Sequence, residues 1–301
     1  MSRLKNLLKK SLKSRTLIYD INSILIHKLG YADIDLAGAN SKYRTFTSLK
    51  KKYKSHIGKT KFTKYKGDDK KRVWICWLQG IDNAPELVKN CYASVKHYIR
   101  DMEIVVLDKS NIKDYVNLPD YIYDKWEKGI IPNAQFSDLV RTELLIEHGG
   151  LWIDSTVYMT GELPSYITDS DFFVYHDGFF DHDMINMNNW LMYSEANNII
   201  LQETQNLLFE YWKTHNYMIH YFIMHMFFRM VTDYYPDEWK KVPYFNQIDQ
   251  HILSTELYND YDEKRFRQLT DLTSIHKLSN KSDYSKVSEK SYYAMLDRLY
   301  K

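Results

Sequence analysis

The residues from 133 to 154 constrain the fold of this chain more than any other segment. Apolar side chains in NAQFSDLVRTELLIEH recur at helical spacing, which predicts a helix over about residues 133–148. Gly149 and Gly150 follow, and glycine readily takes the left-handed conformation that ends many helices. The run LWID comes directly afterwards and predicts a buried strand ending at Asp154. A helix joined to a strand in this way is typical of α/β proteins.

The segments on either side continue this alternation. The apolar runs VWICWL at 73–78 and EIVVLD at 103–108 predict strands, and the residues between them, from about 84 to 99, predict a helix with one apolar face. This is βαβ order, which places two parallel strands in one sheet. Further strands and helices are expected at 171–176, 189–194, 195–214 and 217–233. We therefore expect an α/β fold with a mostly parallel central sheet flanked by helices.

The charge of the chain is unevenly distributed. Residues 1–72 carry 20 Lys and Arg against 5 Asp, a net charge of +15, whereas residues 73–301 carry 21 basic against 34 acidic residues, or −13. Within the first 28 residues, apolar side chains recur at helical spacing between lysines and arginines, from Leu4 and Leu7 to Leu25. That basic amphipathic pattern can lie on an anionic membrane, and it can equally form a helix docked on the body.

These patterns divide the chain into three parts. We expect a basic helical arm and linker at 1–71, with a solvated connection from Lys50 to Lys71, a main α/β domain at 72–280 and a C-terminal helical tail at 281–301. An anionic membrane surface is a candidate partner for residues 1–70. The basic arm could attract nucleic acid by the same electrostatics, but the body is acidic and carries no zinc-finger or RNP-type motif, so we expect no nucleic-acid partner.

The remaining composition favours a cytoplasmic protein. No run reaches the roughly 18 to 20 apolar residues of a spanning helix, and the N-terminal residues lack the unbroken apolar segment of a signal peptide. Cys76 and Cys91 lack the spacing of a zinc site or a disulfide framework. The expected location is therefore the cytoplasm, and attachment of the arm to the inner face of the cell membrane is an open alternative.

Three charged residues meet the requirements of a ligand site. Asp138 and Arg141 are three residues apart and lie on one side of the predicted helix. Taken alone, this pair is more typical of a surface ion pair. Asp154, however, ends the following strand, at the edge where parallel sheets bind their ligands. Together the three residues predict a site where a carboxylate and a bidentate guanidinium contact one ligand.

The segment AQFSDLVRTELLIEHGGLWIDSTVY resembles the A..SD..R…L…GG.Y.D.D region of GT-A glycosyltransferases of the Och1-like mannosyltransferase and clostridial glucosylating-toxin groups. It is most similar to bacterial capsular polysaccharide synthesis proteins. The resemblance extends over about 72–280, including VWICWLQG and SIHKLSNK. It implies a GT-A-like fold and retaining transfer of a hexose from a UDP- or GDP-sugar to a capsular or other surface glycan, with a lipid-linked glycan as one candidate acceptor. A degenerate nucleotide-sugar-binding or scaffolding protein is the alternative.

The resemblance also assigns roles to residues. It implies that Asp138 and Arg141 hold the donor sugar and diphosphate. Asp154 matches the first aspartate of the DXD motif, which contacts ribose or sugar and reaches a metal through water. Asp177, beyond the strand FFVYH, is a candidate on the acceptor or leaving-group side. The positions that match the nucleotide-base site are Trp77, Leu78 and Gln79.

One position departs from the motif. Thr156 stands where the second DXD aspartate would directly bind the metal, and a neutral hydroxyl binds a divalent cation more weakly than a carboxylate does. Either Mn²⁺ or Mg²⁺ is held by Asp154 with groups from elsewhere, or cationic side chains neutralise the diphosphate. His276 and Lys277 are candidates for both routes. His251 is a further candidate to face the cleft.

Overall fold

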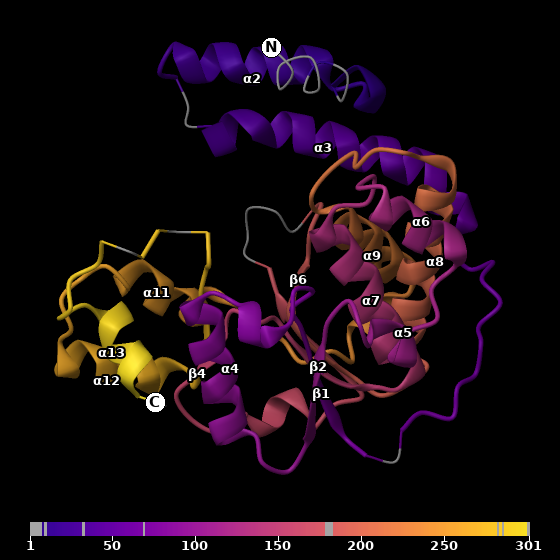
Figure 1. Ribbon diagram of the computed structural model, residues 1–301. Coiled ribbons are helices and arrows are strands. Elements are labelled where there is room, and N and C mark those ends of the chain that lie inside the picture. Colours follow the sequence, from indigo (N-terminus) through magenta and orange to yellow (C-terminus); the bar gives the residue numbers. More distant parts are fainter. Residues whose placement is uncertain are drawn as a thin grey trace.

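The structure, a computed structural model, describes residue 8 and residues 11–31, 34–68, 70–177, 183–281, 283–284 and 286–299, without the side chains of 34–37. Figure 1 shows an α/β body with a helical hairpin above it and a smaller C-terminal group of helices to its left. Leu4 and Leu7 of the amphipathic pattern lie outside the described residues.

The body is built around a five-stranded sheet in the order β2-β1-β3-β6-β5. The first strand pairs in parallel with β2 and β3, while β6 pairs antiparallel with β3 and β5. Four strands therefore share one direction and only β6 opposes them. This confirms the expected mostly parallel sheet. The bounds are β1 Arg72–Cys76, β2 Glu103–Leu107, β3 Gly150–Ile153, β5 Phe172–His176 and β6 Met187–Ser194.

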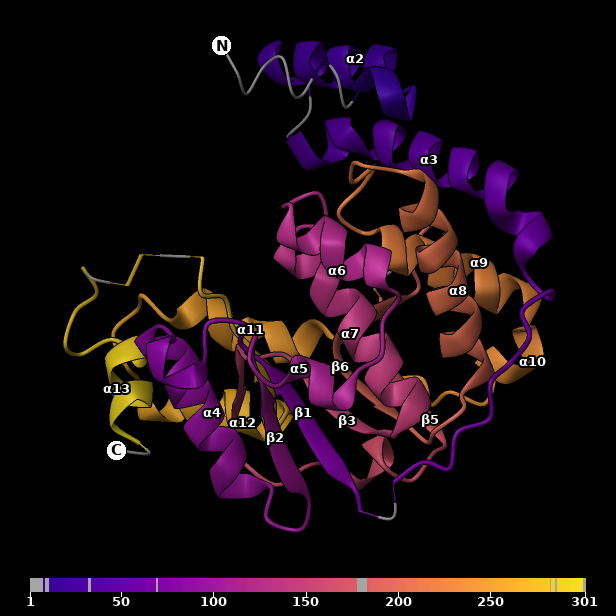
Figure 2. The same cartoon turned by 45° about the vertical axis from the view of Figure 1, so that its right-hand side comes forward.

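Both faces of the sheet are buried, because successive residues of a strand point to opposite sides and here nearly all are apolar. Trp74 and Trp152 face the core shared with the helices α5, α6, α7, α8 and α9. Their neighbours Val73 and Leu151 face the core shared with α4. Figure 2 shows α7 in front of the sheet. The bounds are α4 Glu86–Tyr98, α5 Ile112–Tyr115, α6 Asp120–Glu127, α7 Asn133–Glu147, α8 Ile199–Thr214, α9 Ile223–Tyr234 and α10 Pro236–Trp239.

The junction between α7 and β3 needs both of its glycines. Gly149 and Gly150 have backbone φ values of +73° and +98°, which residues other than glycine rarely adopt. A Cβ atom on Gly150 would lie 2.5 Å from the backbone oxygen of Arg72, and one on Gly149 would lie 2.9 Å from that of Ser194. The two glycines thus let α7 end directly beside the sheet, as the sequence predicts.

The helix predicted over 217–233 begins six residues later, at Ile223 of α9. The hydroxyl of Tyr211 on α8 donates to the carbonyl of Tyr217 (2.7 Å) and accepts from the N–H of Ile219 (3.1 Å). These backbone groups are therefore unavailable to a helix. No helix in the part of the chain that the structure describes is long and apolar enough to cross a membrane.

The C-terminal helices pack on α4 and on a two-stranded sheet. Its strands β4 (Val157–Met159) and β7 (Ile275–Lys277) are antiparallel. Tyr292 and Leu296 of the last helix share a buried cluster with Leu87 and Cys91 of α4. The expected tail thus contributes to the core of its neighbours. The helix bounds are α11 Ile248–Glu256, α12 Glu263–Leu272 and α13 Tyr292–Arg298.

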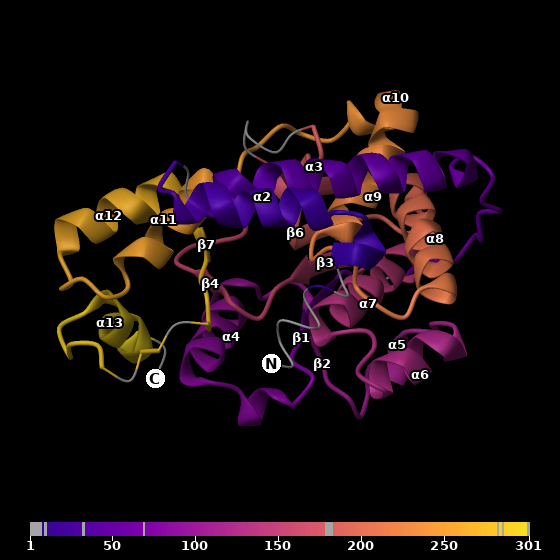
Figure 3. The ribbon, with the colours of Figure 1, turned by 90° about the horizontal axis from the view of Figure 1, so that it is seen from above.

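The N-terminal hairpin consists of α2 (Leu17–Lys28) and α3 (Ile34–Tyr53). Phe46, Leu49 and Tyr53 of α3 are buried in the same core as α8 and α9. The second helix of the hairpin therefore belongs to the body, whereas α2 packs on α3 on the side away from the sheet (Figure 1). Figure 3 shows the hairpin from above, lying across the body.

The connection after the hairpin is exposed for much of its length but is tied to α8. Its first residues, Lys50 to Tyr53, still belong to α3, although the sequence suggests a connection from Lys50 onward. Beyond them, the N–H of Gly58 and the hydroxyl of Thr60 both donate to the carboxylate of Glu203, at 2.9 and 2.7 Å. These bonds fix the path of the chain from the hairpin to β1.

Candidate functional site

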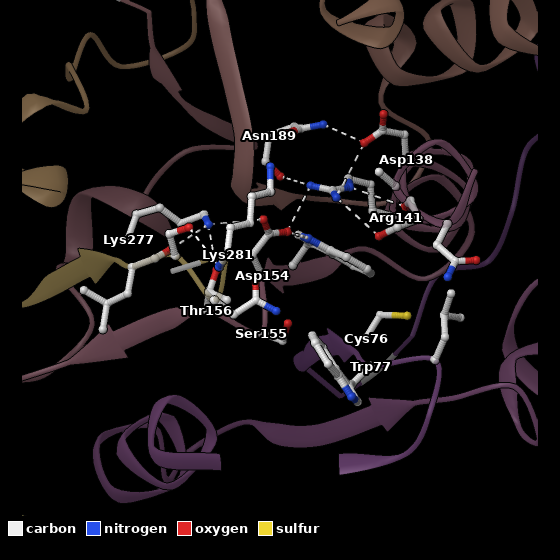
Figure 4. Close-up of a pocket in the computed structure, with 18 of the residues that line it drawn as sticks. Cys76, Trp77, Asp138, Arg141, Asp154, Ser155, Thr156, Asn189, Lys277 and Lys281 are labelled. Carbon is white, nitrogen blue, oxygen red and sulfur yellow. Dashed lines mark hydrogen bonds and ion pairs between the residues drawn. The ribbon is translucent and has the colours of Figure 1, made fainter. Parts of the chain in front are cut away.

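A pocket of about 520 Å³ lies where β1 and β3 end, at the edge of the sheet expected for a ligand. Its lining comes from the end of β1, the first half of α7, the turn between β3 and β4, and residues around β6, α9, α11 and β7 (Figure 4). The structure brings together in it these predicted residues: Trp77, Leu78, Gln79, Asp138, Arg141, Asp154, Thr156, His251 and Lys277.

Arg141 is the centre of the polar groups on one wall. Its Nη1 lies 3.2 Å from Oδ1 of Asp154 and also donates to the backbone oxygen of Asn189. The guanidinium lies over the ring of Trp152, with 4.7 Å to the ring centroid. Only 6% of the Arg141 side chain is exposed. A cation held on so many sides is fixed before any ligand arrives, so little ordering entropy is lost on binding.

Asp138 lies one helical turn before Arg141, 3.5 Å from its Nη2. Its carboxylate accepts from the side-chain amides of Asn189 (2.8 Å) and Gln135 (3.2 Å). Burial raises the pKa of Asp138 to about 7, although Arg141 acts in the opposite direction. This carboxyl group can therefore accept or donate a hydrogen bond near neutral pH, which suits a contact with a sugar hydroxyl.

Asp154 follows β3 and is the more accessible carboxylate, with 26% of its side chain exposed. Its Oδ1 accepts from Nε1 of Trp152 at 3.0 Å in addition to the contact with Arg141. Its Oδ2 lies 3.9 Å from Nζ of Lys277. Asp154 is thus placed between two cations at the wall of the pocket.

Thr156 and Lys277 form a direct pair. The ammonium of Lys277 donates to Oγ1 of Thr156 at 2.7 Å and to the backbone oxygen of Leu278 at 3.1 Å. The departure from the DXD pattern at Thr156 therefore coincides in space with a lysine from a segment about 120 residues later in the chain.

Three residues after β1 line the opposite end of the pocket. The N–H of Trp77 donates to the carbonyl of Leu107 at 2.9 Å, which extends the β1–β2 pairing to the pocket edge. The buried indole Nε1 of Trp77 has no hydrogen-bond partner among the described residues. Gly80 then turns the chain with φ +82°. An aromatic ring with a free donor and the exposed amide of Gln79 are groups that can contact a nucleotide base.

The structure does not place His276 and Asp177 among the lining residues. The side chains of neighbouring strand residues point to opposite faces of a sheet. Because Lys277 points into the pocket, His276 points away from the pocket. The His276 ring is fully buried, its Nε2 lies 3.0 Å from Oγ1 of Thr160, and burial lowers its pKa to about 4. Asp177 accepts from Asn188 (3.1 Å) and Gln247 (3.0 Å) beyond the end of β5.

Sequence reasoning did not single out several lining residues, among them Asn189, Tyr221 and Lys281. Asn189 lies inside an apolar strand, and a polar residue at such a position is a signal that could have been used. His225 also lines the pocket, although its position in an apolar helix suggests a core histidine. Burial lowers its pKa to about 3, so the ring is neutral. Tyr221 and Lys281 lie outside regular elements and carry no such signal.

The groups at Asp154 do not fit a divalent cation. Among the residues that the structure describes, no three His, Cys, Asp or Glu side chains converge as metal ligands. Oδ1 of Asp154 already accepts from Trp152 and faces the guanidinium of Arg141, and the hydroxyl of Thr156 accepts from the ammonium of Lys277. Proteins usually hold Mg²⁺ with one or two carboxylates beside substrate phosphates, and here the carboxylate of Asp154 already faces two side-chain cations that repel a further cation.

Residues 33–296 match the sequence profile of a family described as capsular polysaccharide synthesis protein. The match covers most of the chain, including every pocket residue named above. The chain belongs to the capsular polysaccharide synthesis protein family. A search of curated protein sequences finds no match.

This capsular polysaccharide synthesis protein is similar to solved glycosyltransferase structures. One is "PaToxG Glycosyltransferase", with 17% identity, a TM-score of 0.37, and coverage of 65% of this chain and 79% of that one. Another is the glycosyltransferase GlyE of Streptococcus pneumoniae TIGR4, with 12% identity, a TM-score of 0.37 and coverage of 76% of this chain. The match spans 59% of the GlyE chain. At such low similarity, neither structure assigns an activity to this family member.

Proposed function

We propose that this chain is a GT-A-like glycosyltransferase that moves a hexose from a UDP- or GDP-sugar to a growing capsular or other surface polysaccharide. The observation that carries the proposal is the convergence of three separate segments on one pocket. The end of β1, the SD..R face of α7 and the turn after β3 supply groups suited to a base, a sugar and a diphosphate, within a family of capsular polysaccharide synthesis proteins.

The pocket chemistry supports this assignment. Its volume of about 520 Å³ falls in the usual range of small-molecule sites. We assign the base to Trp77, Leu78 and Gln79, and the sugar to Asp138 and Arg141. Cations beside Asp154 stabilise the negative charge that develops on the departing diphosphate, which is the main electrostatic demand of the reaction. Retention of the anomeric configuration belongs to the same proposal and rests on the family resemblance alone.

A screen of UDP- and GDP-sugars for transfer and hydrolysis tests the proposal. Wild type should turn over at least one donor, and Asp154→Ala and Arg141→Ala should lower its kcat/KM by about 10² to 10³, the usual cost of losing an electrostatic contact in a transition state. Arg265→Ala is a matched control, because Arg265 forms an ion pair with Glu256 on the surface of the C-terminal helices. The site assignment is wrong if both pocket variants retain wild-type turnover.

Thr156 favours a second candidate, a protein that binds a nucleotide sugar without transferring it, alone or as a scaffold in a glycan-assembly complex. The same screen separates the two functions. Binding of UDP or GDP by calorimetry without product from any donor supports this second candidate, and product formation eliminates it. A scaffold without a ligand would also keep its cellular function in the Asp154→Ala variant.

We further propose that the hairpin places the protein on the inner face of the cell membrane, where a lipid-linked glycan would be its acceptor. Four apolar side chains of α2 and its end are 48–79% exposed and lie on one side at helical spacing: Ile18, Ile21, Leu25 and Leu29. The +15 charge of residues 1–72 complements an anionic surface, with about 1 kcal/mol for each basic residue near the lipid. Exposed apolar groups on a strongly basic segment are the two features of an interfacial helix.

Flotation of the full chain with liposomes tests this placement. Wild type should float with vesicles containing phosphatidylserine and remain behind with neutral phosphatidylcholine vesicles. The double substitution Ile18→Ser and Leu25→Ser should reduce flotation at least several-fold, because it removes two apolar contacts with the interface. Equal flotation with both kinds of vesicle, or none with either, contradicts the proposal. Tyr244→Ser, which removes an exposed ring in the segment between α10 and α11, serves as a control.

A further inference from the structure

Lys277 holds a positive charge where the DXD motif is incomplete. Its ammonium donates to the hydroxyl of Thr156 at 2.7 Å and lies 3.9 Å from Oδ2 of Asp154. Figure 4 shows it between these two residues at the wall of the pocket. Only 19% of the side chain is exposed, so the charge is fixed and poorly screened by solvent.

The backbone fixes this geometry. Lys277 on β7 is the register partner of Val157 on β4, which directly follows the turn that carries Asp154 and Thr156. The N–H of Leu278 also donates to the carbonyl of Thr156 at 2.9 Å. The lysine and the incomplete motif are therefore held opposite each other by a strand pair, independently of any ligand.

The net charge of Thr156 with Lys277 can be compared with that of a complete DXD motif that holds a metal ion. An aspartate with one divalent cation carries a net charge of +1, and Thr156 with the Lys277 ammonium carries the same net charge. On the other side of Asp154, the guanidinium of Arg141 lies at 3.2 Å. Together with Asp154 and Asp138, the two cations give a net charge of 0 when Asp138 is ionised and +1 when it is protonated, so this wall carries no excess negative charge that would repel a diphosphate.

We propose that the Lys277 ammonium replaces the divalent cation as the countercharge for the donor diphosphate, so that transfer does not depend on a metal ion. This inference rests on the proposed function. In the reaction, the bond between the anomeric carbon and the β-phosphate oxygen breaks and its electron pair leaves with the diphosphate. The acceptor oxygen bonds to the anomeric carbon, and its proton passes to the departing diphosphate. Lys277 stays protonated and donates to the phosphate oxygens.

The first measurement is turnover of the full-length protein with the donor found in the screen, in EDTA and in Mn²⁺. We expect the two kcat values to agree within about twofold. Lys277→Ala should lower kcat by about 10²-fold in both solutions, as expected for loss of one charge contact in the transition state. Lys277→Met should lower kcat to a similar extent. Because methionine retains most of the lysine stem, this loss would come from the missing charge and not from a packing defect. Lys240→Ala changes an exposed surface lysine and serves as the control.

Two results overturn the inference while the proposed function stands: wild-type turnover that EDTA abolishes and Mn²⁺ restores, or Lys277→Met with wild-type kcat. A second readout does not need turnover. Calorimetry should give the same Kd for UDP or GDP in EDTA and in Mn²⁺, and a Kd at least tenfold weaker in Lys277→Met. Nucleotide binding that requires Mn²⁺, or that is unchanged in the variant, also overturns it. Absence of transfer from every donor, by contrast, contradicts the proposed function.

Discussion

The helices α7 and α2 both carry apolar residues at helical spacing, but most of α7 is buried and most of α2 is exposed. Eleven of the fifteen residues of α7 are buried, whereas only Ser23 is buried among the twelve of α2. In α7 the burial extends to charged side chains, and two of these, Asp138 and Arg141, line the pocket. In α2 the apolar side chains face solvent on the side away from the body. The spacing of apolar residues therefore predicts that each segment is a helix. Only the packing around the helix shows whether it lines a pocket, as α7 does, or leaves its apolar side chains exposed, as α2 does.

The largest expected effect is at Arg141 of α7. Replacing it with alanine removes the ion-pair partner of two carboxylates. Removing one partner of a buried ion pair typically lowers stability by about 3–5 kcal/mol. We expect Arg141→Ala to lower the free energy of unfolding by about 3–5 kcal/mol, measured by urea denaturation, in addition to its effect on turnover. Lys28→Ala, at an exposed position at the end of α2, should change it by less than about 0.5 kcal/mol. Equal effects of the two substitutions would contradict the contrast between the helices.

A leucine from each helix gives a matched test of packing. Leu144 of α7 is fully buried, and Leu25 of α2 is 53% exposed. Leu144→Ala should lower the free energy of unfolding by about 2–5 kcal/mol because it leaves a cavity. Leu25→Ala should change it by less than about 0.5 kcal/mol. Thermal and urea denaturation measure both, and a large loss from Leu25→Ala would show that α2 is packed against another part of the protein in solution.

Two glycines extend the comparison to the backbone. Gly150→Ala introduces a Cβ atom 2.5 Å from the oxygen of Arg72 at φ +98°, so we expect a loss of about 2–3 kcal/mol. At Gly38, within α3, a Cβ atom would have no neighbouring atom within 4 Å, and Gly38→Ala should stabilise the helix by up to about 1 kcal/mol. Circular dichroism during urea denaturation gives both values. A stabilising Gly150→Ala would show that α7 and β3 are joined differently.

The smallest expected effect is the pH dependence contributed by Asp138. Its pKa is about 7 in the folded protein against 3.8 for the ordinary side chain, so between these values the folded state binds a proton that the unfolded chain releases. This stabilisation is complete below about pH 4 and is lost as pH rises through 7. Asp138→Asn should therefore reduce the fall in unfolding free energy between pH 5 and pH 8 by on the order of 1–2 kcal/mol.

The control for this pH effect is Asp237→Asn, an exposed carboxylate on α10 that should leave the slope unchanged. Part of the slope should persist in Asp138→Asn, because burial also raises the pKa of Glu143 to about 7. An unchanged slope in Asp138→Asn would show that this carboxylate is ionised and solvated well below neutral pH.

Local patterns in the sequence were sufficient for the fold but only for part of the site. Glycines at 149 and 150 and the alternation of helix and strand predict the mostly parallel sheet, because these signals act over a few residues. The meeting of Asp138, Arg141 and Asp154 in one pocket follows from the same local rules. The Thr156–Lys277 contact does not, since it joins residues 121 positions apart through the β4–β7 pairing. The roles of these residues in binding and transfer remain predictions.

The attachment of α3 to the body affects the distance between the body and any surface to which α2 binds. This helix is 20 residues long, about 30 Å at 1.5 Å per residue, and it is anchored to α9 by buried side chains and by the ion pair between Lys50 and Asp233 at 2.8 Å. Its Lys42 lies 5.2 Å from the centroid of the Phe222 ring, which in turn contacts His225 of the pocket. If α2 lies on a membrane, α3 runs alongside it, so α3 would act as a rigid layer that holds the body about one helix diameter, roughly 10 Å, from the membrane-bound helix.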